Sequence, residues 1–130
     1  MKKGLVLEGG GMRGLFSAGV LDFFLENNIE FDEVIGVSAG ACNACNFISK
    51  QKYRTKDVWI DYANDKNYCS FNNLRKTGDI FNVDYAWNKI PNELNKFDYE
   101  TFKNSKTKMI AVATNIENGK PKYFSINDLK

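Results

Sequence analysis

The spacing of apolar and polar residues near the N-terminus predicts two short strands joined by a helix. Residues 4–8 form a mostly apolar run of strand length, and residues 33–37 form a second one. Between them, residues 14–27 carry apolar side chains at helical spacing, namely Phe16, Val20, Leu21, Phe24 and Leu25. Strands joined through one helix are expected to pair in parallel, with a right-handed crossover. The first 37 residues therefore predict a β-α-β unit.

The helical spacing continues after the second strand and then weakens. Helices are predicted over residues 39–50, with Ala41, Cys45 and Ile48 on the packed face, and over residues 55–63. Residues 64–77 keep neither a helical nor a strand period for long, which favours a loop.

The following segment predicts two short helices. Asp84 is expected to cap a helix that Pro91 prevents from continuing far, and Asp98 a second one that extends to Phe102. The aromatic residues here suit an acyl-chain groove or a lid that touches a membrane. Aromatic residues at helical spacing are more often core, however, so we expect them to cover the sheet.

The C-terminal part predicts a β-hairpin. Lys108–Thr114 is a strand pattern, Asn118-Gly119 is a strong turn signal, and residues 123–126 follow as a second strand. Alternating strands and helices are typical of α/β proteins with a mainly parallel sheet. With 130 residues, 43% of them hydrophobic, residues 1–130 are expected to form one domain or part of one.

The charge of this chain indicates no particular class of binding partner. The formal net charge is +2, and its 18 basic and 16 acidic side chains form no basic stripe of the kind that binds nucleic acid. Glu8 and the glycines after it interrupt the apolar N-terminus too early for a signal peptide. No later segment approaches the roughly 18 to 20 apolar residues of a membrane span. A cytoplasmic protein is expected, with contact to membrane surfaces left open.

The three cysteines, Cys42, Cys45 and Cys69, suit a reducing compartment better than a disulfide framework. Cys42 and Cys45 form a C-x-x-C pattern near a predicted helix start, where a thiolate is favoured. Small apolar side chains are also what a closely packed helix requires, and we favour that interpretation over redox chemistry. A zinc site is disfavoured because the chain has no histidine and no fourth thiol.

The pentapeptide Gly36-Val37-Ser38-Ala39-Gly40 predicts a nucleophile elbow, a sharp turn from a strand into a helix with the serine at its apex. The residues two before and two after the serine approach too closely for a Cβ, and Gly36 and Gly40 meet that demand. Ser38 is the candidate nucleophile, and the Ala39 amide is a candidate oxyanion donor. The alternative is a tight turn followed by a helix N-cap.

A glycine loop upstream favours the catalytic interpretation. Gly9-Gly10-Gly11-Met12-Arg13-Gly14 follows the first strand and leads into a helix. Such a loop presents bare amide groups, which stabilise the negative charge of a tetrahedral intermediate. Gly10, Gly11 and Met12 are the candidate donors. Both motifs follow parallel strands, and sites of such sheets lie at the carboxyl ends of the strands.

In this order and spacing, the two motifs resemble the start of a patatin-like phospholipase domain. The resemblance implies a three-layer α/β/α sandwich with a mainly parallel sheet, of which this chain is the N-terminal part. It also implies a serine acyl hydrolase with a Ser-Asp dyad, in which the glycine loop and Arg13 form the oxyanion hole.

Nucleotide binding is the main competing interpretation, because Gly9-x-Gly11-x-x-Gly14 matches the dinucleotide fingerprint. That fingerprint requires an acid at the end of the second strand, whereas Asp32 and Glu33 lie at its start. No Gly-Lys-Ser/Thr follows the glycines, so a P-loop is excluded as well.

The base for Ser38 is not identified. The chain has no histidine, so a Ser-His-Asp triad is excluded and a carboxylate has to act. In patatin-like enzymes the aspartate lies in a downstream Asp-Gly-Gly or Asp-Gly-Ala motif, and this chain has no Asp-Gly. The most similar dipeptide is Gly78-Asp79, in which the order of the two residues is reversed. Asp128 lies in no such motif. The expected base is an aspartate beyond Lys130.

The sequence thus predicts hydrolysis of lipid carboxylic esters, without a metal or cofactor, by a protein of unassigned oligomeric state. One alternative is a non-catalytic lipid- or acyl-binding module that keeps the shape of the site without its base. A dinucleotide-binding domain is the other.

Overall fold

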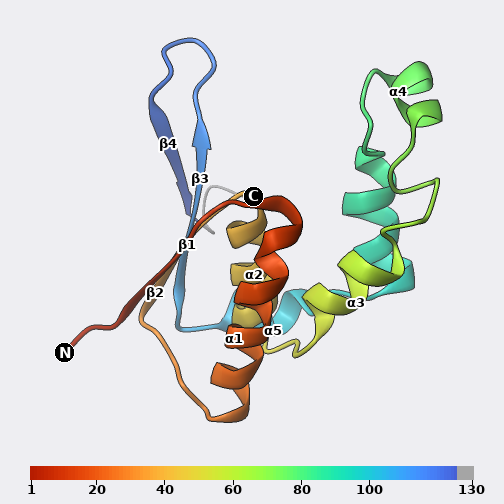
Figure 1. Ribbon diagram of the computed structural model, residues 1–130. Helices are drawn as coiled ribbons and strands as arrows, with labels where there is room; N and C mark the ends of the chain where they lie inside the picture. Colours follow the sequence, from red (N-terminus) through yellow and green to blue (C-terminus); the bar gives the residue numbers. More distant parts are fainter. Residues whose placement is uncertain (126–130) are drawn as a thin grey trace. The chain divides into compact units, whose positions relative to one another are not determined.

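The computed structural model describes residues 1–125, which fall into two compact units. The first unit contains Met1–Tyr53 and the segment from Asp98 on, and the second contains Arg54–Phe97 (Figure 1). The sequence positions Ile126 and Asp128, named above, lie outside the described residues. That residues 1–130 form part of a single domain stays a prediction.

A four-stranded sheet in the order β1-β2-β3-β4 organises the first unit. Its strands are β1 (Gly4–Leu7), β2 (Glu33–Val37), β3 (Lys108–Thr114) and β4 (Pro121–Ser125). β1, β2 and β3 pair in parallel, with Leu7 opposite Gly36 and Gly36 opposite Ala111. β4 runs antiparallel to β3. The α/β class with a mainly parallel sheet and the predicted hairpin are confirmed.

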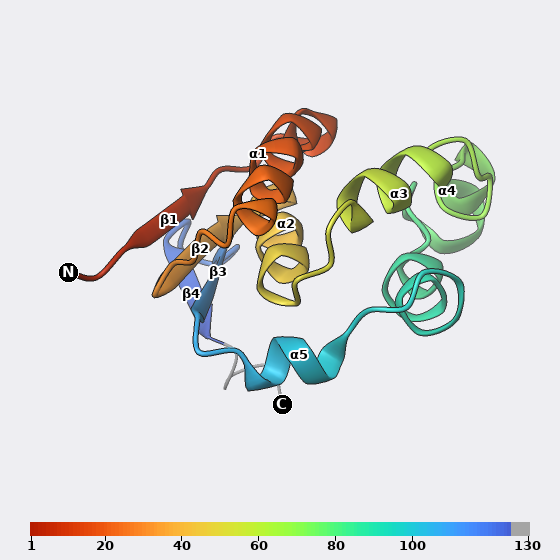
Figure 2. The same cartoon turned by 90° about the horizontal axis from the view of Figure 1, so that it is seen from below.

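The helices of the first unit are the short 3-10 turn η1 (Gly11–Arg13), α1 (Gly14–Glu26), α2 (Ala39–Ile48) and α5 (Tyr99–Asn104). α2 lies on β1, β2 and β3, and α1 and α5 contact α2. Figures 1 and 2 show α1 and α2 on the same side of the strands. Within residues 1–125, sheet and helices thus make two of the three expected layers.

The hydrophobic core lies between the sheet and α2. Val34 is fully buried on the central β2, and Leu7 and Met109 flank it on the neighbouring strands. Ala44 and Phe47 of α2 pack against them. Burying a side chain such as Val34 contributes about 1.5–3 kcal/mol. This core holds the carboxyl end of β2 and the start of α2 in place.

The face by which α1 packs differs from the prediction. Gly14, Ala18 and Leu21 are buried, whereas Phe16 is 82% exposed and Val20 is 38% exposed. Residues 14, 18 and 21 lie on one face of the helix. Of the predicted apolar positions, Leu21, Phe24 and Leu25 do pack toward the core, whereas Phe16 and Val20 do not. Gly14 and Ala18 take the packed positions of the first turns, where they permit close packing.

The second unit is helical, with α3 (Arg54–Asp61), α4 (Phe71–Thr77) and the π-helix η2 (Tyr85–Leu94). The prediction of a loop over residues 64–77 is wrong for α4. Ser70 caps this helix, since its side chain accepts a hydrogen bond from the Asn73 amide at 3.1 Å. Gly78 ends it in the left-handed conformation, at φ 86°. The capping residues form α4 although its apolar pattern is weak.

Two details of η2 are corrected. Asp84 makes no capping bond, and the Asn82 side chain accepts from the Tyr85 amide at 3.1 Å instead. The helix continues three residues beyond Pro91, to Leu94. In an α-helix the proline ring collides with the carbonyl four residues earlier, and the wider π-helix winding relieves that collision.

The expectation that the aromatic residues of this region form core is correct only in part. Phe102 packs against the core of the first unit, and the Asp98 side chain caps α5 by accepting from the Thr101 amide at 2.8 Å. Phe81 and Trp87 are 54% and 64% exposed. No helix within residues 1–125 combines the length and apolar character needed to cross a bilayer.

Candidate active site

Ser38 lies at the turn between β2 and α2, in the geometry of an elbow. Its backbone has φ 51° and ψ −120°, a conformation that non-glycine residues rarely adopt. Such a residue costs about 1–3 kcal/mol and persists only where the surrounding structure imposes it. The side chain does not cap α2 and makes no hydrogen bond within residues 1–125, and the residue is exposed. Its hydroxyl therefore faces solvent.

The glycines on either side of Ser38 permit the turn. A Cβ at Gly36 would lie 2.6 Å from the Ala41 backbone nitrogen. A Cβ at Gly40 would lie 2.2 Å from the Leu7 carbonyl oxygen and 2.7 Å from that of Glu8. These distances are too short for any side chain, so the backbone of β1 presses directly on the start of α2.

The glycine loop lies beside Ser38, although about 25 residues separate them in sequence. β1 and β2 are neighbours, so their carboxyl ends meet at one edge of the sheet. A Cβ at Gly9 would lie 3.2 Å from the Ser38 Cβ. Among residues 1–125, the amides of Gly10, Gly11 and Met12 donate to no backbone carbonyl. The candidate donors are therefore available beside the candidate nucleophile.

Arg13 folds back over this loop. A Cβ at Gly10 would lie 3.6 Å from its Nε and 3.8 Å from its Nη2. Both Arg13 and Met12 are exposed, so the guanidinium and the amides share the solvent side of the loop. A cation here favours the negative charge that develops on a substrate oxygen.

Asn43 is a residue of this region that the sequence analysis missed. It lies on α2, is 1% exposed, and donates from Nδ2 to the Gly14 carbonyl oxygen at 2.8 Å. Gly14 is the last residue of the loop and the first residue of α1. A polar residue within the small, apolar start of α2 was the available signal.

The three aspartates described in the first unit each bind a residue other than Ser38. Asp22 accepts from the Tyr53 amide and Asp32 from the Lys3 amide, at 2.9 and 2.6 Å. Asp98 accepts from the Thr101 hydroxyl and amide, and the hydroxyl holds the pKa of its carboxyl below the usual range. Gly78-Asp79 lies in the second unit, where Gly78 is the C-cap of α4.

Asp32 and Glu33 also lack the position that a ribose-binding acid requires. Asp32 precedes β2 and Glu33 is its first residue, so both lie at the amino end of the strand, whereas Ser38 follows its carboxyl end. Glu33 forms an ion pair with Lys108, with 3.2 Å between the carboxylate oxygen and Nζ. Neither acid is near the glycine loop.

Cys45 belongs to the packing of the fold. Cys45 Sγ donates to the Met109 Sδ at 3.7 Å, and no disulfide joins any of the three cysteines. This contact places Cys45 against the buried residues of β3.

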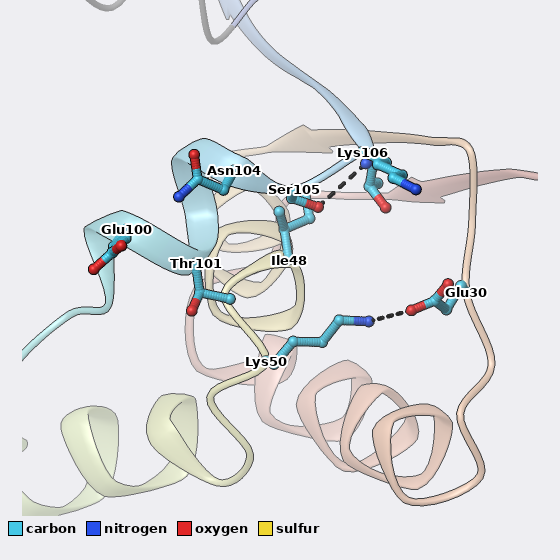
Figure 3. Close-up of a pocket in the computed structure, with 9 residues that line it drawn as sticks. Glu30, Ile48, Lys50, Glu100, Thr101, Asn104, Ser105 and Lys106 are labelled. Carbon is cyan, nitrogen blue, oxygen red and sulfur yellow. Dashed lines mark hydrogen bonds and ion pairs between the residues drawn. The ribbon is translucent and has the colours of Figure 1, made fainter.

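A cavity of about 420 Å³ lies at the other end of the sheet (Figure 3). Its lining includes Glu30 before β2 and Thr107 before β3, whereas Ser38 follows β2. The Lys50–Glu30 ion pair, with 2.7 Å between Nζ and Oε1, crosses it. A charged cavity at this position does not suit an acyl chain and takes no part in the site.

An exposed serine on a strand-to-helix turn, beside a loop with available amides, is the arrangement of an α/β acyl hydrolase. The sequence profile of the Patatin-like phospholipase family matches residues 5–129. The chain belongs to this family.

One relative is the uncharacterized protein YjjU of Escherichia coli strain K12, which is 39% identical over 82 residues. The match covers 62% of this chain and 23% of that protein, so the chain spans about a quarter of the length of its relative. No solved structure gave a significant match.

Proposed function

We propose that the protein containing this chain hydrolyses carboxylic esters of lipids with Ser38 as the nucleophile. The observation that carries the proposal is the juxtaposition of Ser38 with the glycine loop, where a Cβ at Gly9 would lie 3.2 Å from the Ser38 Cβ. The serine supplies a nucleophile, and the loop supplies donors for the charge that follows attack.

The reaction has two steps. Ser38 Oγ attacks the ester carbonyl carbon while its proton passes to an aspartate, and the carbonyl oxygen takes the negative charge. The amides of Gly10, Gly11, Met12 and Ala39, with Arg13, stabilise that charge. The intermediate collapses, the alcohol leaves with the proton, and water then releases the acid from Ser38.

The base is proposed to be an aspartate beyond Lys130. The three aspartates described in the first unit, Asp22, Asp32 and Asp98, each accept a hydrogen bond from a residue other than Ser38. A carboxylate near Ser38 would also need a raised basicity, and Asp98 has a lowered pKa.

The substrate is proposed to be an ester at a lipid surface. Met12 in the loop and Phe16 in the first turn of α1 are 55% and 82% exposed. Apolar side chains beside the site favour contact with lipid. A cytoplasmic location stays a prediction of the sequence.

The test compares Ser38→Ala with the parent in the natural protein that contains this chain. The assays are hydrolysis of a soluble nitrophenyl ester, hydrolysis of phospholipid vesicles, and labelling by a fluorophosphonate. Ser38→Ala is expected to lower kcat by about 10³-fold or more and to abolish labelling. Asp79→Asn is the matched control for the base, and it is expected to leave both kcat and fluorophosphonate labelling unchanged.

Unchanged ester hydrolysis in Ser38→Ala would rule out this mechanism. If the parent binds fatty acid saturably but turns over no ester, the non-catalytic acyl-binding module is supported instead.

A further inference from the structure

The loop beside Ser38 is held at both of its ends by residues of α2. At its start, the backbone of Gly40 presses on the carbonyls of Leu7 and Glu8. At its end, Asn43 Nδ2 donates to the Gly14 carbonyl oxygen at 2.8 Å. Gly40 and Asn43 lie two and five residues after Ser38, so the helix that begins at the nucleophile also holds the loop.

The Asn43 contact spans a long stretch of sequence in a buried place. The side chain is 1% exposed and joins residues 29 apart. Its Oδ1 is buried and has no hydrogen-bond partner within residues 1–125. An unsatisfied buried acceptor lowers stability by at least as much as one neutral hydrogen bond, such as that of Nδ2, contributes. Stability alone therefore gives little reason for an asparagine here.

We propose that Asn43 is a positioning residue that fixes the glycine loop relative to Ser38 in the reaction. This inference rests on the proposed function. The hydrogen bond to Gly14 fixes the position of the loop. It thereby places Arg13 and the amides of Gly10, Gly11 and Met12 for the moment when the ester carbonyl oxygen becomes negative. Asn43 touches no reacting atom and acts through the loop.

The test replaces Asn43 by leucine, which has a similar size and no polar atom, and by alanine as a second variant. Asn43→Leu is expected to fold with a Tm close to that of the parent, because the loss of the Nδ2 hydrogen bond to Gly14 and the removal of the unsatisfied acceptor offset each other. Its kcat on a soluble ester is expected to fall about 10- to 100-fold with KM unchanged, because a small misplacement of catalytic groups costs up to about 100-fold.

Two further readouts separate positioning from a loss of folded protein. Rates are normalised to the fraction of serine that a fluorophosphonate labels at completion. The inhibition constant of a trifluoromethyl ketone, whose adduct carries an oxyanion, is expected to rise by the same factor as kcat falls. Within residues 8–14, the Arg13 and Gly14 amides donate to carbonyls of the loop, and their hydrogen exchange is expected to accelerate in both Asn43 variants.

Asn46→Ala is the matched control, since it changes a buried asparagine of the same helix about one turn further from the loop. It is expected to leave kcat and the exchange of residues 8–14 unchanged. The inference is overturned if the folded Asn43→Leu variant keeps its kcat within twofold and its loop exchange unchanged. It is also overturned if both Asn43 variants fail to fold, because Asn43 is then a structural residue.

Failure of the proposed function is distinguishable from failure of this inference. Unchanged hydrolysis in Ser38→Ala refutes the function, and hydrogen exchange then still decides whether Asn43 holds the loop.

Discussion

At the scale of single residues, the shape of the site depends on positions that have no side chain. Ser38 adopts its strained backbone because α2 meets β1 at Gly40, and β2 at Gly36, without an intervening Cβ. The free energy gained by packing the core thus maintains a backbone conformation that Ser38 would not adopt by itself.

Gly40→Ala is expected to destabilise the fold by about 3 kcal/mol or more, at or above the upper end of the usual cost of overpacking. The new Cβ would meet backbone atoms of Leu7 and Glu8, at 2.2 to 2.7 Å, which cannot rotate away. Urea unfolding measures the change.

The same substitution at Gly19 is the matched control and is expected to have the opposite sign. Gly19 lies within α1, and a Cβ there has no atom within 4 Å. Alanine in a helix interior is about 1 kcal/mol better than glycine. Equal effects of the two substitutions would contradict the close approach at Gly40.

At the scale of elements, the second unit is held together partly by polar contacts between its helices. Asp65 follows α3, and Tyr85 is the first residue of η2. Tyr85 donates from its hydroxyl to Asp65 Oδ2 at 2.6 Å, which raises the pKa of Tyr85 to about 12 and lowers that of Asp65. The pair therefore joins two elements while Tyr85 is protonated.

An alkaline titration is expected to show this pair. Because the pKa of Tyr85 is higher in the folded protein than its ordinary value of 10.0, the contribution to stability is complete below pH 10 and is lost as the pH rises through about 12. Tyrosinate absorbance measures the midpoint. Asp65→Asn is expected to move the Tyr85 midpoint back toward 10, and an unmoved midpoint would contradict the assignment.

At the scale of the whole molecule, the described part of the first unit has a helix layer on only one face of its mainly parallel sheet. By register, Val6, Ile35 and Ile110 form one row across the other face. Val6 is 72% exposed, and Tyr123 on the neighbouring β4 is 63% exposed. Parallel sheets are almost always covered on both faces, as in the three-layer sandwich that the resemblance implies.

The 130-residue chain expressed by itself is therefore expected to bind a hydrophobic dye and to associate as its concentration rises. Dye fluorescence and sedimentation measure this. Val6→Lys is expected to reduce both effects. Ile116→Lys, which changes a 98% exposed residue of the turn between β3 and β4, is expected to alter neither. A chain that stays monomeric and binds no dye would show that this apolar face does not cause association.

Much of the fold follows from local patterns in the sequence. The apolar runs predicted β1, β2 and β3, and the glycines around Ser38 predicted the elbow. Both signals depend only on residues that are neighbours in the sequence. The pattern of apolar residues failed where capping or packing decided instead. Ser70 and Gly78 bound α4 despite its weak periodicity, and η2 passes Pro91 by a change of helix type.

The sequence by itself determined the order of the elements, the α/β class and the two motifs that place a serine and a glycine loop after neighbouring strands. Only the tertiary structure decided that α1 buries Ala18 and exposes Phe16, and that Asn43 holds the carbonyl of Gly14. The reason is physical: periodicity records which faces of an element are apolar. Which residue meets which partner depends on how closely two backbones approach, and that distance is set by contacts far apart in the chain.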